Sequence, residues 1–405
     1  MTAPALVLVE PGAHRAGGHR HRTLTALAAS HGNTVVVAPR EVAAETREAL
    51  RAAGARTTRP RGALPTLLVA LGLATAATAE AAVRAVALSG SSPQSVRRFP
   101  HQVMLVSRCL IEAACIRTGR RLAGPSSAVV VLSASEALHG AAALLAGPHT
   151  RFVHEVVTTE DTALRLVGRL ARRGERRVQM LAPTEAVRDD LATRFPRLPV
   201  RVRPFAIADE GDRLARPERE QARKALGIPS AAAVVCLVGG WWPYKDFAVV
   251  ETALAQLDVP VHVVVAGAPL HTSVLDRWFL LPRVRLHVVP GPVSEPDIRA
   301  VYAASDAALV TRRPGTEKES GLVVDALRLG VPLIVSDHDA ALAAALAGRG
   351  WARVFRSGDG AALARALNGL ARSPLPRPPR RGGAEFGVPT SVEQVRFLTL
   401  PEELR

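Results

Sequence analysis

The chain of 405 residues is 48% apolar and 22% charged, which is typical of a soluble globular protein and excludes disorder as its main state. At about 150 residues per domain, this length predicts two or three domains. The 52 basic residues exceed the 36 acidic ones and give a formal net charge of +16, which favours phosphates, nucleic acid or an anionic membrane as partners without selecting among them.

Short apolar runs alternate with helical segments through the first half of the chain. We expect strands at residues 5–9, 34–38, 128–132 and 151–153, and a helix from about Thr23. Continuous apolar runs of this length are typical of parallel strands that are buried on both faces. Strand, helix and strand at this spacing predict βαβ units and therefore a parallel sheet.

The most apolar stretch of the chain covers residues 63–79. A membrane-spanning helix usually needs about 20 strongly apolar residues. This stretch is shorter, is rich in Ala and Thr, and contains Pro65 and Gly72, so we expect a buried or surface-docked helix. Residues 1–11 lack a basic segment followed by a long apolar run, and we therefore expect a cytoplasmic protein without a secretory signal.

The second half repeats the alternation of strands and helices. We expect strands at residues 233–238, 261–266, 284–289, 307–310 and 332–336. The polar, weakly periodic stretch 204–223 separates the halves, and it predicts one domain at 1–203 and a second at 204–372. Residues 373–405 then form a tail, rich in Pro and Gly at its start, that we expect to return to the first domain. The prediction is an α/β protein of two Rossmann-like domains with a cleft between them.

Ligands of such sheets bind beyond the carboxyl ends of the strands, and two glycines follow the first strand. Gly17 and Gly18 would allow close approach of a ligand to the backbone, or they form a plain tight turn. The full G-x-G-x-x-G fingerprint of dinucleotide binding is absent. Three histidines are close by in the sequence, but no acidic or Cys residue in range supports a metal site there: His14, His19 and His21.

Cysteine chemistry is not expected, because Cys109, Cys115 and Cys236 share no ligand spacing. We predict three buried, inert thiols and no structural zinc site.

A glycine-rich loop follows the first strand of the second half. Gly239 and Gly240 lead to Lys245, one of only three lysines in an Arg-rich chain. A lysine between a strand and a helix is suited to a diphosphate, although a solvated loop lysine is the alternative. Trp241 and Trp242 are either packing residues or the wall of a cleft, and the sequence does not decide between these roles.

A capped helix is expected near residue 320. Ser320 is a favourable N-cap, Gly321 opens the helix, and Gly330 ends it. The free amides of the first turn, with Leu322 among its residues, favour an anion. The carboxylates of Glu317 and Asp325 are suited to sugar hydroxyls, while an ordinary capped helix is the alternative.

Two further features of the first half suggest contacts with ligands. His154 follows an expected strand, so it either faces the cleft or is a structural histidine. Residues 164–173 place arginines at helical spacing, which suits an anionic lipid surface or simply a charged surface helix.

Taken together, these residues resemble the retaining GT-B glycosyltransferases of family 4, the "glycosyl transferases group 1". Four blocks carry the resemblance in the second half. The loop 238–246 resembles the family's "VGR…KG" loop, and residues 264–267 resemble the strand and turn that come next in the family. Residues 291–306 resemble "G.V…L..LY..AD", and residues 320–337 resemble "GLPxLEAxAxGxPVxASD". Gly17 and Gly18 resemble the N-terminal GG loop of the family, and 183–188 resembles its "PSEAVR" element. Residues 48–150 match least.

The resemblance implies transfer of a sugar from a nucleoside-diphosphate donor with retention of configuration. It implies that Lys245 neutralises the diphosphate, that the amides of Gly321 and Leu322 bind it, and that Asp325 holds the ribose. Glu317 would contact the donor sugar, because it precedes Asp325 by the family's E-x7-E spacing, and His154 would lie on the acceptor side. No metal or other cofactor is implied, and the acceptor is a small molecule, a glycan or a glycolipid.

Two departures from the family pattern bear on the donor site. Gly240 stands where the family has an Arg, and Arg312 or Arg313 is a candidate substitute. Glu319 competes with Glu317 for the donor sugar, because Gly321 lies one position later than the pattern requires. Three alternatives remain open: a different reaction on a GT-B fold, a non-catalytic sugar-nucleotide binder, and a nucleic-acid binder that is supported by charge alone.

Overall fold

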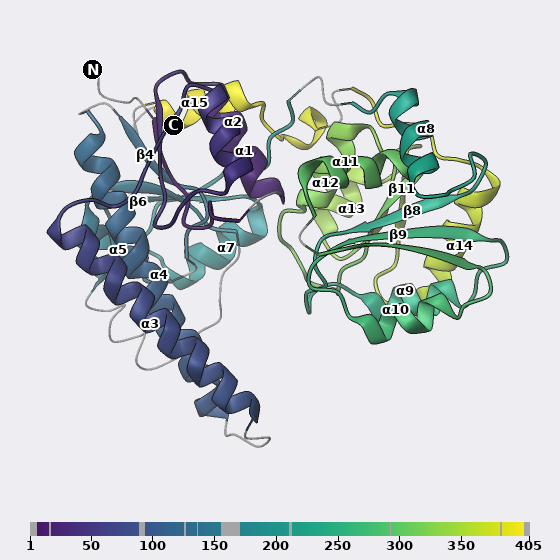
Figure 1. Ribbon diagram of the computed structural model, residues 1–405, viewed down its shortest axis with the longest axis horizontal. Coiled ribbons are helices and arrows are strands. Elements are labelled where there is room, and N and C mark those ends of the chain that lie inside the picture. Colours follow the sequence, from purple (N-terminus) through teal and green to yellow (C-terminus); the bar gives the residue numbers. More distant parts are fainter. Residues whose placement is uncertain are drawn as a thin grey trace. The chain divides into compact units, whose positions relative to one another are not determined.

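The structure is a computed structural model that describes residues 6–15, 18–88, 94–124, 127–135, 137–154, 171–209, 213–291, 293–380 and 383–400, with backbone only at 19, 83–88 and 94–99. The chain forms two compact units (Figure 1). The first runs to Phe205, apart from Gly17–His19, and also includes the segment from Ser391. The second comprises Ala206–Thr390.

The first unit is built on a parallel sheet of seven strands in the order β3-β2-β1-β4-β5-β6-β7. Its strands are β1 (Leu6–Val9), β2 (Thr34–Val37), β3 (Arg56–Thr58), β4 (Ala128–Val131), β5 (His149–Phe152), β6 (Val178–Ala182) and β7 (Val200–Val202). The four expected strands are confirmed. β1, β2 and β4 are fully buried because each is a continuous apolar run. β3, β6 and β7 were not expected.

Before the second unit begins, the described helices of the first unit are α1 (Gly18–Ala29), α2 (Ala44–Ala52), α3 (Ala63–Leu88), α4 (Gln94–Leu122), α5 (His139–Ala146) and α7 (Glu185–Arg194). The start expected for the first helix was wrong, because α1 begins at Gly18 and not at Thr23. Leu24 and Leu27 of this helix are nonetheless buried in the core.

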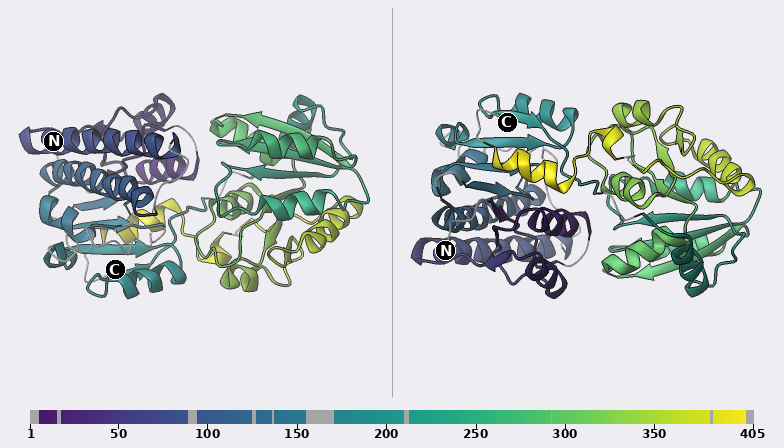
Figure 2. Two further views of the ribbon diagram at one scale, coloured as in Figure 1. Left: turned by 90° about the horizontal axis from the view of Figure 1, so that it is seen from below. Right: turned by 90° about the horizontal axis from the view of Figure 1, so that it is seen from above.

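The apolar stretch 63–79 is the first part of α3, a helix of 26 residues that pairs with α4 in a long hairpin (Figure 2). Within α3, residues Ala63–Ala82 are long and apolar enough to cross a membrane by length and composition, and only 22% of that segment is buried. The expected helix is therefore confirmed, and it is mostly exposed.

The second unit is built on a parallel sheet of six strands in the order β10-β9-β8-β11-β12-β13. Its strands are β8 (Val234–Val238), β9 (Val261–Gly267), β10 (Val284–Pro290), β11 (Ala307–Val310), β12 (Leu333–Ser336) and β13 (Ala352–Phe355). The helices are α8 (Arg216–Ala225), α9 (Phe247–Leu254), α10 (Thr272–Phe279), α11 (Glu295–Ala304), α12 (Gly321–Leu329), α13 (Ala340–Leu346) and α14 (Gly360–Arg372). All five expected strands are confirmed, and β13 was not expected.

The end of the chain forms a short 3-10 helix, η1 (Ala384–Phe386), and then α15 (Ser391–Thr399). α15 is fixed to the first unit by its polar side chains. Ser30 donates a hydrogen bond to Ser391 at 2.6 Å, and the amide of Gln394 contacts Arg203 at 2.6 Å and the carbonyl of Pro204 at 3.0 Å. The last described helix therefore completes the unit in which the chain begins.

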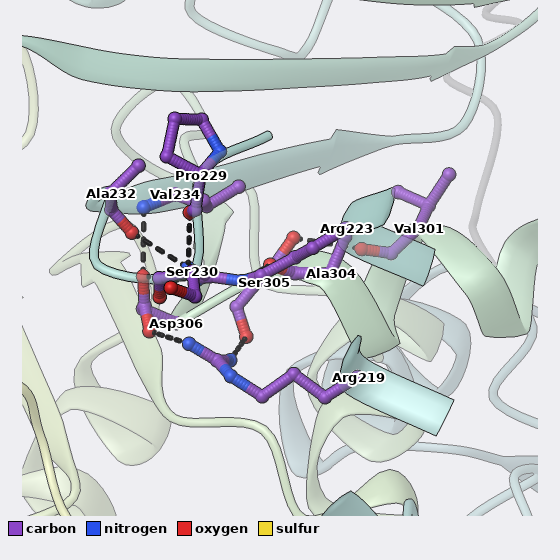
Figure 3. Close-up of polar contacts among 10 residues, drawn as sticks. All are labelled: Arg219, Arg223, Pro229, Ser230, Ala232, Val234, Val301, Ala304, Ser305 and Asp306. Carbon is purple, nitrogen blue, oxygen red and sulfur yellow. Dashed lines mark hydrogen bonds and ion pairs between the residues drawn. The ribbon is translucent and has the colours of Figure 1, made fainter. Parts of the chain in front are cut away.

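A cluster of charges around the buried Arg223 closes the amino-terminal edge of the second sheet (Figure 3). Asp306, just before β11, accepts hydrogen bonds from Arg219, from Arg223 at 2.8 Å and from the amide of Val234 at 2.8 Å. Arg223 also donates to backbone carbonyls, including those of Ala304 and Ser230. The end of the polar stretch 204–223 belongs to α8, and Ala222 and Arg223 of this helix enter the core of the second unit.

Candidate functional site

Loops from neighbouring strands meet at the carboxyl edge of the second sheet. The loop after β8 pairs with the loop after β11, because Lys245 and Arg312 form an antiparallel β-bridge. The amide of Arg313 donates to the carbonyl of Tyr244 at 2.9 Å, and that of Asp246 to the carbonyl of Thr311 at 3.3 Å. This pairing brings Lys245 next to the loop that precedes α12.

Lys245 is partly buried at this edge. Its Nζ donates hydrogen bonds to the carbonyls of Val238 at 2.9 Å and Gly239 at 3.1 Å. Burial, and secondarily the positive charge of Arg312, lower the pKa of Lys245 to about 7. At pH 7 only about half of the Lys245 side chains are therefore protonated, and a bound anion would stabilise the charged ammonium form.

Arg312 supplies a second cation from the end of β11. Its side chain is almost fully buried, and its Nη1 donates to the carbonyl of Lys318 at 2.8 Å. The ring of Tyr244 lies beneath both cationic groups of this loop, at 5.5 Å from the guanidinium of Arg312 and 3.7 Å from Nζ of Lys318. Arg313, the other candidate substitute, is exposed. Arg312 therefore orders the loop and places positive charge beside Lys245.

Gly240 has no room for a side chain. A Cβ atom there would lie 2.2 Å from the carbonyl oxygen of Ala268, and a Cβ on Gly267 would lie 2.6 Å from the carbonyl carbon of Gly239. Gly239 also adopts a φ of 84°, which favours glycine. The Arg that the family pattern places at this position is thus incompatible with the packing of the two loops.

The N-terminus of α12 follows the Arg312 loop. Ser320 occupies the N-cap position, as expected. Its hydroxyl accepts no hydrogen bond from an amide of the helix, so the expectation that its side chain caps the helix is wrong. Its Oγ is buried, with no hydrogen-bond partner among the described residues. Gly321 and Leu322 begin the helix, and Gly330 ends it with a φ of 74°, as expected. Amides of the first turn and a buried hydroxyl are together suited to an anionic oxygen.

The three carboxylates near α12 have different environments. Glu317 is exposed in the loop. Glu319 is partly buried, and its Oε1 accepts the amide of Ala206 at 3.2 Å, which commits it to a backbone contact. Asp325 is 7% exposed and lies four residues beyond Gly321, on the same face of the helix.

The two tryptophans of the glycine-rich loop separate into a packing residue and an exposed one. Trp241 is buried and stacks on Phe247 with ring centroids 4.1 Å apart. Trp242 is 49% exposed.

His338 was missed by the sequence analysis, although it follows β12 at the same edge. Its Nδ1 lies 2.8 Å from the carbonyl of Ser336, and Ser336 accepts the amide of Arg312 at 3.0 Å. Burial, and then the charge of Arg312, lower the pKa of His338 to about 4, so the ring is neutral at pH 7. The buried Nε2 has no partner among the described atoms. A histidine two residues beyond a buried strand was the available signal.

His154 lies at the carboxyl edge of the sheet in the first unit. Its Nε2 is 3.1 Å from the carbonyl of Leu132, and its ring contacts Phe205 edge-on at 4.3 Å. Gly18 is the first residue of α1 with a φ of 79°, and Gly17 lies outside the described residues. The segment 164–170 also lies outside them, so the arginine-rich helix expected there is not described over that part.

Glu10, another residue that the sequence analysis missed, directly follows β1. Its two oxygens accept the amide of Gly12 and the hydroxyl of Ser133, each at 2.7 Å. Burial raises its pKa above the ordinary value. Glu10 therefore ties together the loops that follow β1 and β4.

The three thiols are buried, as expected, and burial raises the pKa of Cys109 and Cys236 to about 12. Among the described residues, no three His, Cys, Asp or Glu side chains are grouped so as to hold a metal ion.

Comparison with known proteins identifies the fold. Residues 232–373 match the model of the family described as "Glycosyl transferases group 1", and no curated protein matches the sequence. Among solved structures, Anabaena Alr3699/HepE in complex with UDP and glucose is similar, with a TM-score of 0.60 and 15% identity over 98% of each chain. WaaG, a glycosyltransferase involved in lipopolysaccharide biosynthesis, has a TM-score of 0.57 and 13% identity over 98% of this chain and 100% of its own.

The N-terminal domain of Candida albicans trehalose-6-phosphate phosphatase is also similar, with a TM-score of 0.58 and 11% identity over 98% of this chain and 96% of its own. The fold is GT-B, with two Rossmann-like units on parallel sheets of seven and six strands. At such low identity these likenesses establish the fold alone, so function must be argued from the site.

Proposed function

We propose that the chain is a glycosyltransferase that moves a sugar from a nucleoside-diphosphate donor to an acceptor with retention of configuration. The observation that carries this proposal is the buried, unpartnered Oγ of Ser320 at the start of α12. It lies at the end of a loop that Arg312 orders and that pairs with Lys245. The match of residues 232–373 to the group 1 glycosyl transferases supports the same assignment.

In this proposal the diphosphate binds at the N-terminus of α12. The amides of Gly321 and Leu322 and the hydroxyl of Ser320 hold its oxygens, while Lys245 and Arg312 supply positive charge. Preorganised cations and dipoles stabilise the charge that develops on a leaving diphosphate, which is the largest catalytic contribution we assign. Charge neutralisation by these groups requires no metal.

The remaining roles follow the family pattern. Asp325 holds the ribose hydroxyls, Glu317 contacts the donor sugar, and His154 belongs to the acceptor side. Gly239 and Gly240 allow the loop after β8 to approach the donor closely. We prefer Glu317 to Glu319 because the carboxylate of Glu319 is bound to the amide of Ala206.

A non-catalytic protein that binds sugar nucleotide is the second candidate. Gly240 favours it, because the usual arginine of the clamp is absent and cannot be accommodated. Donor binding without transfer to any of a broad set of acceptors would support this candidate over the first.

A panel of nucleoside diphosphates and their sugars, tested by thermal shift, examines the donor assignment. We expect one nucleotide to raise Tm, because a ligand at 100 times its Kd stabilises the native state by about 2.7 kcal/mol. Ser320→Ala should weaken the binding of that nucleotide about ten-fold, since it removes one hydrogen bond to a charged oxygen. Ser373→Ala, at an exposed serine, is the matched control. No shift with any nucleotide would contradict donor binding.

Nucleotide affinity should also decrease as the pH rises above 7. The pKa of Lys245 is about 7 in the free protein, and a bound diphosphate raises it, so binding takes up a proton at pH 8. Kd should then increase by up to about ten-fold per pH unit between the two pKa values. Calorimetry in two buffers of different ionisation enthalpy measures this uptake. Lys245→Arg, which stays protonated, should flatten the pH dependence, and a Kd constant from pH 7 to 9 in the unmodified protein would contradict the assignment.

A further inference from the structure

One face of α3 is an exposed apolar stripe. Six exposed residues form it, each three or four positions from another member, and we call them the α3 stripe: Leu64, Leu67, Ala70, Leu71, Ala74 and Ala77. The leucines are 40%, 53% and 47% exposed in chain order. Large apolar side chains repeated along one helix face, and not scattered singly, mark an interaction surface.

The opposite face of α3 is already occupied by α4. Ser107 of α4 donates a hydrogen bond to the carbonyl of Gly72 at 2.6 Å, and a Cβ on Gly72 would lie 2.6 Å from Cγ1 of Ile111. Leu68 and Ala79 are buried on this inner side. The two helices are therefore in close contact at Gly72, and α3 cannot rotate to bury its stripe within the unit.

Positive charge surrounds the base of the hairpin. Arg121, at the end of α4, donates to the carbonyl of Arg61, just before α3, at 3.2 Å. Arg120 donates to the carbonyl of Pro148 at 2.7 Å, and Arg108, farther along α4 beside Ser107, is exposed. By contrast, Glu80 is the only charged residue between positions 63 and 82 of α3. An apolar strip with arginines at its end is suited to a surface that is apolar inside and anionic outside.

We propose that the α3 stripe docks on the surface of an anionic lipid bilayer, with α3 lying along the membrane plane. This inference does not depend on the proposed function. Crossing the bilayer is disfavoured because α3 is held at its midpoint by α4, and α4 carries Arg108 and Arg117. A second copy of the chain is disfavoured because facing hairpins would bring like charges together in a protein of net charge +16.

Co-sedimentation of the full chain with lipid vesicles tests the proposal. We expect binding to phosphatidylcholine vesicles that contain phosphatidylglycerol, and loss of binding to pure phosphatidylcholine or at high salt. Leu67→Glu/Leu71→Glu should lower the partition coefficient at least about ten-fold, because it places two carboxylates on the stripe. Both leucines are exposed, so circular dichroism and Tm should be unchanged.

Phe279→Glu/Leu280→Glu is the matched control, because these side chains of the second unit are 73% and 80% exposed and lie outside the stripe. This variant should bind vesicles as the unmodified protein does. Equal loss of binding in both variants would overturn the proposal, and so would unimpaired binding of the stripe variant. A lipid-free dimer that Leu67→Glu/Leu71→Glu dissociates would also overturn it, since the stripe would then be an interface between copies.

Discussion

Lys245→Met should lower the rate of sugar transfer at saturating donor by about 100- to 1,000-fold, the cost typical of removing one group that stabilises developing negative charge. The backbone of Lys245 pairs through the β-bridge with Arg312, in the loop that precedes α12, and this pairing fixes the position of the amine. Arg312 remains in the variant, so nucleotide binding should weaken less than turnover does. Steady-state kinetics with the nucleotide sugar identified by thermal shift measures both effects.

The lower transfer rate of Lys245→Met should not arise from unfolding. Burial and the nearby Arg312 lower the pKa of Lys245, which means that the folded state disfavours its charge. Methionine removes that charge at similar volume, so we expect Tm at pH 7 to remain close to that of the unmodified protein. Lys224→Met is the control, because Lys224 is exposed on α8. Turnover that survives Lys245→Met at saturating donor would refute the assigned role.

Most strands that the sequence predicted correctly are buried on both faces, whereas the edge strand β10 was predicted although only Val284 in it is buried. Val35–Val37 and Val263–Val265 are uninterrupted apolar runs, and the structure buries every residue in them, as such a pattern predicts. The strands it missed lack that pattern. β3 reads Arg-Thr-Thr at the edge of its sheet and is largely exposed, while Gln179 interrupts β6 although it is itself buried. Pairing with a neighbouring strand, and not local composition, stabilises these segments.

The candidate site was predictable in part because its loops follow strands that the sequence also predicts. Lys245 and Gly321 were found because strand–loop–helix junctions are visible in the chain. The conflict at Gly240 could be noticed but not explained, because the atom that excludes a side chain belongs to Ala268, from another loop. The free hydroxyl of Ser320 was predicted as a cap, since residue type alone does not report which hydrogen bond is made. Glu10 and His338 act through contacts that only the fold creates.

A buried ion pair supports the first sheet near His154. Glu112 of α4 accepts a hydrogen bond from Arg151 of β5 at 2.5 Å, and both side chains are almost completely buried. The other oxygen of Glu112 accepts the amide of Ser135 at 2.6 Å, in the loop whose residue Leu132 contacts His154. Burial and the charge of Arg151 lower the pKa of His149 to about 3. The His149 ring beside Arg151 is therefore neutral and adds no charge to the ion pair.

Glu112→Gln should therefore lower the free energy of unfolding of the first unit by about 3–5 kcal/mol, because it leaves the guanidinium of Arg151 buried and unpaired. Calorimetry should show the transition of this unit at a lower temperature, whereas Glu185→Gln, which breaks a surface pair with Arg188, should cost less than about 1 kcal/mol. Replacing Glu112 and Arg151 together by Leu and Met should recover much of the loss, since desolvation of two charges offsets their attraction. If the double variant were as unstable as Glu112→Gln, packing and not the unpaired charge would be the cause.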